Sequence, residues 1–258
     1  MRVSIQSRLH YHFAQPADVL LAVEALDLAE QVIVQDALTM RPDVERRDVI
    51  GGGGDQRAKW IHAEGDLEID YTATVDVTRI VRDLGDLPAT PRHELSADVV
   101  RYLFPSRYCE ADQLVGFAMN TFGDLSGGAQ ATAMADWVFD HLDYVPGSST
   151  GVTSAADTFM SRQGVCRDYA HLFISFARAM GLPARMVSVY APGIEPPDFH
   201  AIADVWLDGA WQLIDPSRMS DIGNVVRIAS GRDATDISFM TIFGTAELKE
   251  QSVHVTLE

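Results

Sequence analysis

The chain contains little cysteine and no long apolar segment, and both absences limit what it can be. Two cysteines in 258 residues are too few for the disulfide framework of a small secreted domain and fit a reducing compartment. No run approaches the roughly 18 consecutive apolar residues that a membrane span requires. The first residues alternate in polarity and lack the apolar block of a signal peptide. We therefore expect a cytoplasmic protein without a membrane segment.

Basic residues are scarce as well. The sequence has 20 Lys and Arg residues against 37 Asp and Glu residues, which gives a net charge of −17. This balance argues against a basic groove for nucleic acid. A negative field raises the local concentration of cations, so amine-bearing or basic peptide substrates are one expectation. The alternative is that the acidity mainly serves solubility.

The common signatures of metal and nucleotide sites are missing from the sequence. There is no Cys-x-x-Cys pair and no His-Glu-x-x-His motif, so a zinc site is not expected. The four glycines at 51–54 should form a turn, but they lack the Gly-Lys-Ser/Thr ending of a phosphate-binding loop. We therefore expect chemistry that needs no metal and no organic cofactor.

The pattern of apolar residues changes near residue 90. Residues 3–13 and 67–77 alternate between apolar and polar, as strands with one buried and one exposed face do. The proline-containing stretch at 87–91 is the best candidate for a linker between two domains. Beyond it the periodicity is helical at 97–104, 112–122, 129–142 and 155–162, and strands return from Arg185 onward. The sequence therefore predicts an α+β protein with a β-rich amino-terminal domain at 1–90 and a second domain at 91–258.

Cys166 stands at the start of a predicted helix. The apolar stripe that follows it ends at Gly181-Leu182-Pro183 and consists of Tyr169, Leu172, Phe173, Phe176, Ala177 and Met180. A thiol at a helix start lies near unpaired N–H groups and the positive end of the helix dipole, which favour the nucleophilic thiolate. The alternative is a buried structural cysteine. Cys109 has neither a helix pattern nor a histidine block beside it, so we interpret Cys109 as structural.

Two strand-like runs surround Asp208-Gly209, which is a strong signal for a β-hairpin. A two-residue turn makes His200 and Asp215 diagonal neighbours on one face of the hairpin. An aspartate in that place fixes the tautomer of the histidine ring and stabilises the imidazolium. Taken singly, His200 reads as a core histidine and Asp215 as a turn residue. Together with a helix-start cysteine they predict a Cys-His-Asp triad.

Several stretches together resemble the bacterial transglutaminase-like superfamily, whose members are often described as candidate cysteine proteases. They are 164–171, 181–185, 198–201 and 213–216, supported by 105–109, Trp137-Val138 with Tyr144, and 231–234 with Phe243-Gly244. The first 90 residues resemble the β-rich amino-terminal domain of these proteins, so the likeness extends over nearly the whole chain. It implies a papain-like α/β core, with the nucleophile at a helix N-terminus packed on an antiparallel sheet.

The resemblance also implies roles for individual residues. Cys166 would be the nucleophile, His200 the base and Asp215 the group that orients the base. The side-chain oxyanion donor and the walls of the site would come from Trp137, Tyr144, Asp168 and Tyr169. A further conspicuous stretch, Gly231-Arg232-Asp233, could form one wall of the cleft, although no physical argument from the sequence assigns it a role.

The predicted chemistry is acyl transfer through a thioester. His200 takes the proton of Cys166, and the thiolate attacks an amide or ester carbonyl. Water then gives hydrolysis and an amine gives transamidation, and both outcomes use the same triad. Three hypotheses stay open: a cysteine peptidase or amidase, a transglutaminase-type acyltransferase, and a non-catalytic binding module. The chain departs from the family pattern at two positions: Arg167 stands where glutamine is commoner, and Ile202 stands where many relatives have tryptophan. Both departures concern substrate preference rather than the triad.

Overall fold

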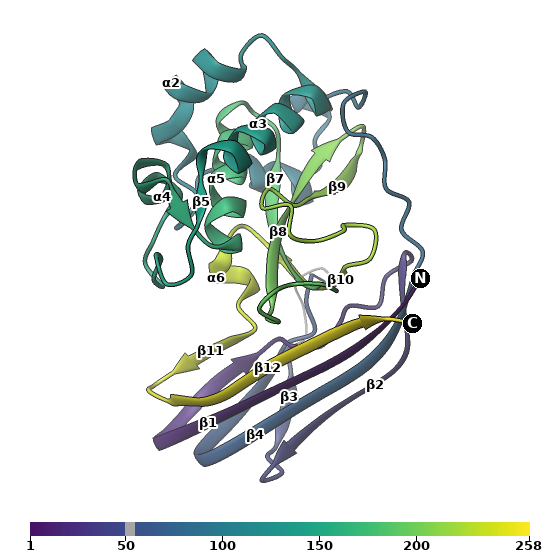
Figure 1. Ribbon diagram of the computed structural model, residues 1–258, viewed down its shortest axis with the longest axis vertical. Helices are drawn as coiled ribbons and strands as arrows, with labels where there is room; N and C mark the ends of the chain where they lie inside the picture. Colours follow the sequence, from purple (N-terminus) through teal and green to yellow (C-terminus); the bar gives the residue numbers. More distant parts are fainter. Residues whose placement is uncertain (50–54) are drawn as a thin grey trace.

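The computed structural model describes residues 1–49 and 55–258, which form an upper layer of helices and short strands and a lower sheet of long strands (Figure 1). The glycines at 51–54, for which the sequence predicts a turn, lie outside the described residues. The elements in chain order are β1 (Arg2–Leu21), β2 (Gln31–Arg41), β3 (Arg46–Asp48), β4 (Lys59–Val77), η1 (Arg92–Glu94), α1 (Ala97–Val100), η2 (Arg101–Leu103), α2 (Ala111–Phe122), α3 (Gly127–His141), β5 (Asp143–Tyr144), α4 (Ala155–Ser161), β6 (Gln163–Gly164), α5 (Cys166–Ala179), β7 (Ala184–Tyr190), β8 (His200–Leu207), β9 (Ala210–Ile214), β10 (Val226–Gly231), α6 (Ala234–Ile237), β11 (Met240–Phe243) and β12 (Glu247–Leu257).

The lower sheet is antiparallel and has β1 and β4 at its centre. The predicted alternation of the first third is confirmed, because Val3, Ile5 and Leu9 of β1 are buried on one face. That face packs against the upper layer, where Tyr190 and Val226 belong to the same apolar cluster. Burying one such aliphatic side chain stabilises the fold by about 1.5–3 kcal/mol. The two layers therefore share a core.

The end of the chain returns to the lower sheet. Both β11 and β12 pair with β1, with Leu21 opposite Met240 and Val3 opposite Leu257. The two termini consequently lie beside each other (Figure 1). The segment 91–258, expected as one domain, thus contributes strands to both layers. Such pairing across more than 200 residues leaves no local pattern in the sequence.

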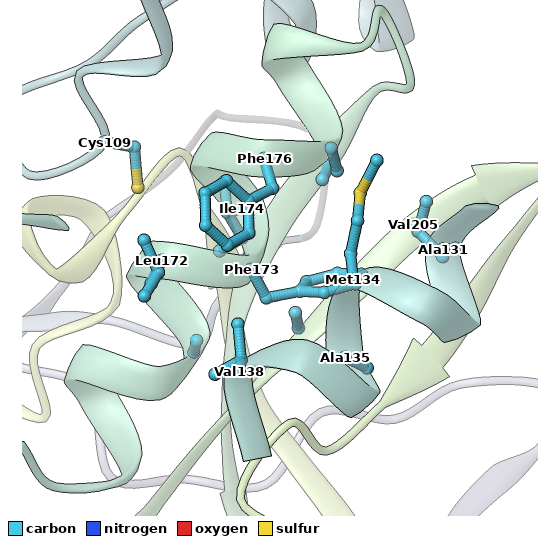
Figure 2. Packing of buried hydrophobic residues seen from close by; sticks show 14 of the residues in the cluster. Cys109, Ala131, Met134, Ala135, Val138, Leu172, Phe173, Ile174, Phe176 and Val205 are labelled. Atoms are coloured by element: carbon cyan, nitrogen blue, oxygen red, sulfur yellow. The ribbon is translucent and has the colours of Figure 1, made fainter. Parts of the chain in front are cut away.

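The upper layer packs its helices on an antiparallel sheet with the strand order β10-β7-β8-β9. Helix α5 is its centre, and Phe173 and Phe176 are fully buried. Helix α3 brings Met134 and Val138 into the same cluster, close to Phe173 (Figure 2). Truncating a buried phenylalanine here would cost about 3–5 kcal/mol. This packing fixes the position of the first turn of α5.

The predicted helices agree with the structure except at 97–104. There a four-residue helix, α1, continues into the 3₁₀ turn η2, and Phe104 is already extended. The physical reason is Pro105, whose ring disfavours helical backbone at the residue before it. No helix among the described residues is long and apolar enough to cross a bilayer.

Candidate active site

Cys166 is the first residue of α5, and its neighbours shape the start of the helix. The Oδ2 atom of Asp168 accepts a hydrogen bond of 2.8 Å from the backbone N–H of Val165. Gly164 must be a glycine, because a Cβ atom there would lie 2.6 Å from the Cβ atom of Asp168. Cys166 is only partly buried and lines a cleft. The thiol is therefore presented at a helix N-terminus that its own local sequence defines.

His200 and Asp215 meet as the hairpin predicts. Asp208 and Gly209 both have positive φ angles, 51° and 72°, as a two-residue type I′ turn requires. In the pairing of β8 with β9, Ala203 lies opposite Ile214, the last residue of β9. Asp215 follows directly after this strand end. The His200 Nε2 atom lies 2.9 Å from the Asp215 Oδ2 atom. The predicted contact is confirmed.

Asp215 is held by more donors than the sequence indicated. Its Oδ1 atom accepts hydrogen bonds from the N–H and hydroxyl of Ser217, and Oδ2 accepts from the N–H and hydroxyl of Ser220. Burial opposes ionisation, but the bonds from His200 and these serines keep the pKa of Asp215 below its ordinary value. The Asp-Pro-Ser turn was the available signal, because aspartate commonly accepts from backbone N–H groups two residues on.

His200 is buried, yet its pKa rises. Burial alone would lower the pKa of His200, but hydrogen bonds and charge at Asp215 and Cys166 raise it to about 10. The His200 ring thus has a hydrogen-bond partner on each side, the Asp215 carboxylate and the Cys166 sulfur. A thiolate beside an imidazolium is the reactive pair of cysteine nucleophiles.

Tyr144 is brought to Cys166 by a short parallel pairing. Strand β5 places Tyr144 beside Gly164 of β6, and Val145 donates to the Gly164 carbonyl at 3.0 Å. The Tyr144 hydroxyl interacts with both the backbone N–H and the side chain of Cys166; burial first, and then the charge of Cys166, raise the pKa of Tyr144 to about 12. The structure therefore places the Tyr144 hydroxyl beside the backbone N–H and the thiol of Cys166.

The other residues expected in the site wall lie beneath or away from the cleft. Trp137 is not brought to Cys166: its ring stacks on His141 at 4.3 Å and packs on Phe117 at 5.0 Å, inside the helical layer. The expectation for Trp137 is corrected, because a large apolar ring gains more from this aromatic cluster than from a wet cleft. Tyr169 donates to the Leu142 carbonyl at 2.7 Å and so steadies the strand that carries Tyr144.

The cleft has a volume of about 730 Å³ and lies between the two layers. The core contributes Cys166 and His200, and α6 and β11 form the opposite wall. Asp233, from the Gly231-Arg232-Asp233 stretch, caps α6 by accepting from Thr235 at 2.9 Å and also accepts from the Tyr108 N–H at 3.0 Å. The stretch thus holds a wall of the cleft in place.

Comparisons with known proteins identify the family and the fold. Residues 116–216 match the family model described as the transglutaminase-like superfamily, a range that contains Tyr144, Cys166, His200 and Asp215. A solved structure of a candidate cysteine protease from Cytophaga hutchinsonii is 34% identical, covers 99% of this chain and 90% of its own, and superposes with a TM-score of 0.95.

Two curated mycobacterial relatives match a smaller part of the chain. An uncharacterized protein of Mycobacterium leprae is 34% identical over 116 residues, which is 41% of each protein. An uncharacterized protein of Mycobacterium tuberculosis is 32% identical over 120 residues, which is 40% of this chain and 38% of that protein. The chain therefore spans less than half the length of the curated relatives it matches.

Proposed function

The chain belongs to the transglutaminase-like superfamily, and we propose that it is a cysteine-dependent amide hydrolase, a peptidase or amidase that works through a thioester acyl-enzyme. One observation carries the proposal. Cys166 begins a helix beside His200, and the His200 ring is held by Asp215 at 2.9 Å. A nucleophile, a base and an orienting group in that order are what thiol acyl transfer needs.

The first half of the proposed reaction breaks the amide. The Cys166 sulfur attacks the carbonyl carbon, and the carbonyl oxygen becomes an oxyanion that the Cys166 N–H and the Tyr144 hydroxyl stabilise. His200 then donates its sulfur-side proton to the leaving nitrogen, the carbon–nitrogen bond breaks and the amine departs. The acyl group stays on Cys166 as a thioester. Asp215 keeps the ring oriented and stabilises its positive charge.

The second half frees the enzyme. His200, now neutral, takes a proton from a water molecule, and the hydroxide attacks the thioester carbonyl. The carbon–sulfur bond breaks, the carboxylic acid leaves, and thiolate and imidazolium are restored. An amine in place of water would give a new amide, which is the acyltransferase alternative. The partial exposure of Cys166 supports hydrolysis, because water can reach a thioester there.

The third hypothesis, a non-catalytic binding module on the same scaffold, has less support. A binding module has no chemical need for a buried carboxylate that accepts hydrogen bonds from two serines and a histidine. Retaining such a carboxylate costs desolvation energy unless every oxygen is satisfied. The bond from this carboxylate to His200, which lines the cleft together with Cys166, therefore favours a working site.

Reactivity of the two thiols is the first test. Iodoacetamide near neutral pH should modify Cys166 well before Cys109, because burial raises the pKa of Cys109 to about 12. Mass mapping of the modified peptides gives the two rates separately. Equal or reversed rates in the folded protein would remove Cys166 from its proposed role.

Reaction class is the second test. The purified protein is offered a peptide library with and without a labelled primary amine, in the presence and absence of chelator. We expect amide cleavage that survives chelator and is lost in Cys166→Ala. Incorporation of the label without cleavage would favour the acyltransferase. If neither reaction occurs and no cysteine probe modifies Cys166, the binding module replaces both.

A further inference from the structure

Strand β11 is a free edge of the lower sheet within the described residues. It pairs with β1 only, from Asp18 opposite Phe243 to Leu21 opposite Met240. The Ala22 N–H donates to the Phe239 carbonyl at 2.9 Å, which fixes the phase of the ladder. Because alternate residues of an antiparallel strand bond to the partner, the N–H and C=O groups of Met240 and Ile242 point away from β1. The Met240 carbonyl accepts from the Ser238 hydroxyl, so Ile242 keeps both groups available.

The cleft runs along this edge rather than across a face of the sheet. Its lining includes every residue from 238 to 242. A cavity over one face of a strand would be lined by alternate residues, because successive side chains point to opposite faces. Strand β11 itself contributes three consecutive residues, Met240 to Ile242, and this indicates that the strand is exposed from its side. Cys166 and His200 line the same cavity.

The edge at β11 also lacks the usual protection against pairing. The other rim strands of the lower sheet carry charged side chains, as in Glu247 and Lys249 of β12 and Arg46 and Arg47 of β3. Charges on an edge strand deter a second chain from adding to the sheet. Strand β11 reads Met-Thr-Ile-Phe and has no charge and no proline. The uncharged edge thus borders the cleft that contains Cys166, to which the charged strand β12 contributes Gln251 alone among the described lining residues.

We propose that the substrate is an extended polypeptide segment that adds as a strand to the free edge of β11 and so brings its scissile amide to Cys166. The inference rests on the proposed function and names its substrate class. Strand addition takes affinity from main-chain hydrogen bonds, and side chains at alternate positions give specificity. The cavity volume of about 730 Å³ lies within the range of about 300–1,000 Å³ that is typical of ligand pockets. The lower sheet is then half of the substrate site.

The substrate side of the test uses the best-cleaved peptide from the library. Each backbone nitrogen on both sides of the scissile bond is methylated in turn, and kcat/KM is measured. Methylation of a nitrogen that donates to β11 should lower kcat/KM by about two- to ten-fold, as the loss of one net hydrogen bond implies. These losses should recur at every second residue of the peptide. The intervening nitrogens are the matched control, because their methyl groups point away from β11. A profile without the two-residue period overturns the inference.

The protein side of the test uses two prolines. Ile242→Pro removes an N–H that the β1 ladder does not use, and proline is tolerated at such edge positions. We expect a loss of peptide cleavage of about ten-fold, matching one or two bonds, with the rate of Cys166 alkylation unchanged. Thr241→Pro removes an N–H that bonds to β1 and should lower the melting temperature instead. Equal peptide kinetics in Ile242→Pro and the parent protein would overturn the inference.

The outcomes separate this inference from the proposed function. If amides are cleaved but neither the methylated peptides nor Ile242→Pro changes kcat/KM as expected, the proposed hydrolase is retained and strand addition is rejected. If nothing is cleaved and Cys166 is not modified, the proposed function fails first. If the parent protein is a dimer that Ile242→Pro converts to monomer, a second copy occupies the edge, and strand addition by substrate is overturned.

Discussion

Two clusters of cysteine, histidine and aspartate lie in the upper layer, and they differ in access to the cleft, in the direction of their hydrogen bonds and in the pKa of the histidine. In the first, Cys166 and His200 line the cleft and His200 bonds to Asp215. The second comprises Cys109, His171 and Asp233 and is referred to below as the buried cluster. Cys109 lies within the apolar core (Figure 2), and its thiol donates to the backbone carbonyl of His171 at 3.6 Å.

The histidines of the two clusters differ in the direction of their hydrogen bonds and in their pKa. His171 accepts a hydrogen bond of 3.1 Å from the Ala234 N–H and stacks on Tyr108, so its ring serves as an acceptor in a dry setting. Burial lowers the pKa of His171 to about 3, although the charge of Asp233 opposes the change. His200 donates to a carboxylate instead, and its pKa rises to about 10. Residue types alone do not make a triad; the direction of the hydrogen bonds does.

The largest expected effect contrasts the two thiols. Cys166→Ala should lower kcat for amide cleavage by about 10⁴-fold or more, as loss of the nucleophile does in other acyl-transfer enzymes. Cys109→Ala should keep kcat within a few-fold and cost about 1 kcal/mol in unfolding free energy, because one buried atom is lost. Steady-state kinetics and urea unfolding measure the pair. A Cys109→Ala protein that is folded and inactive would contradict the contrast.

The next effect contrasts the two carboxylates. Asp215→Asn should lower kcat by about 10³- to 10⁴-fold with the fold intact, because the ring loses its preferred tautomer. Asp233→Asn should retain kcat within several-fold but lose about 1–3 kcal/mol of stability, because one backbone donor at Tyr108 or Thr235 loses its acceptor. The same kinetic and unfolding measurements apply. Equal kinetic losses in both variants would mean that the buried cluster acts in catalysis.

The cluster of Cys166, His200 and Asp215 could be predicted from the sequence because its signals are local. Gly164 before Cys166 and the apolar stripe after it define a helix start, and Asp208-Gly209 sets a hairpin register that carries His200 to Asp215. These features depend on residues within about ten positions of one another, where turn geometry and periodicity apply. The family resemblance rests partly on the same stretches, whereas the β-rich first third is predicted from the alternation at 3–13 and 67–77.

The remaining features depend on contacts between distant segments. Tyr144 reaches Cys166 because β5 pairs with β6, whereas the Trp137 ring joins the aromatic cluster, and neither contact is visible in the sequence. The wall formed by β11 depends on pairing with β1, more than 200 residues away. No periodicity in a single sequence reports such pairing. The cytoplasmic location expected from the low cysteine content stays a prediction.

Acid stability should distinguish the two histidines. The pKa of His171 is about 3 in the folded protein and near 6.5 when unfolded, so between these values the unfolded state binds the extra proton. The contribution of His171 to stability is therefore complete above about pH 6.5 and is lost as the pH falls towards 3. His171→Gln should flatten the acid side of the urea-unfolding profile between pH 7 and pH 4. His200→Gln is the control, because His200 is protonated in both states below pH 6.5.

The smallest expected effect concerns the charge of the substrate. The net charge of the whole chain is negative, whereas the charged side chains that line the cleft are mainly positive. The net charge of −17 favours approach of cationic peptides, whereas the cleft lining includes Arg107 and Arg167 beside Asp198. We expect lysine-containing peptides to exceed matched glutamate peptides in kcat/KM by a few-fold at low salt. The ratio should approach one by about 1 M salt, since the Debye length falls from about 30 Å at 0.01 M to about 3 Å.

A pair of arginine variants shows which charges set this preference. Arg107 lies over the Tyr108 ring at the cleft wall, so Arg107→Gln removes a cation from the site and should widen the preference for lysine. Arg47→Gln changes the net charge equally but on the exposed strand β3, and should leave the ratio of the two peptides close to that of the parent. Both variants are measured at two salt concentrations with the same peptides. If glutamate peptides are faster and Arg107→Gln reverses the order, the arginines of the cleft outweigh the field of the chain, because short-range contacts are screened less than long-range ones.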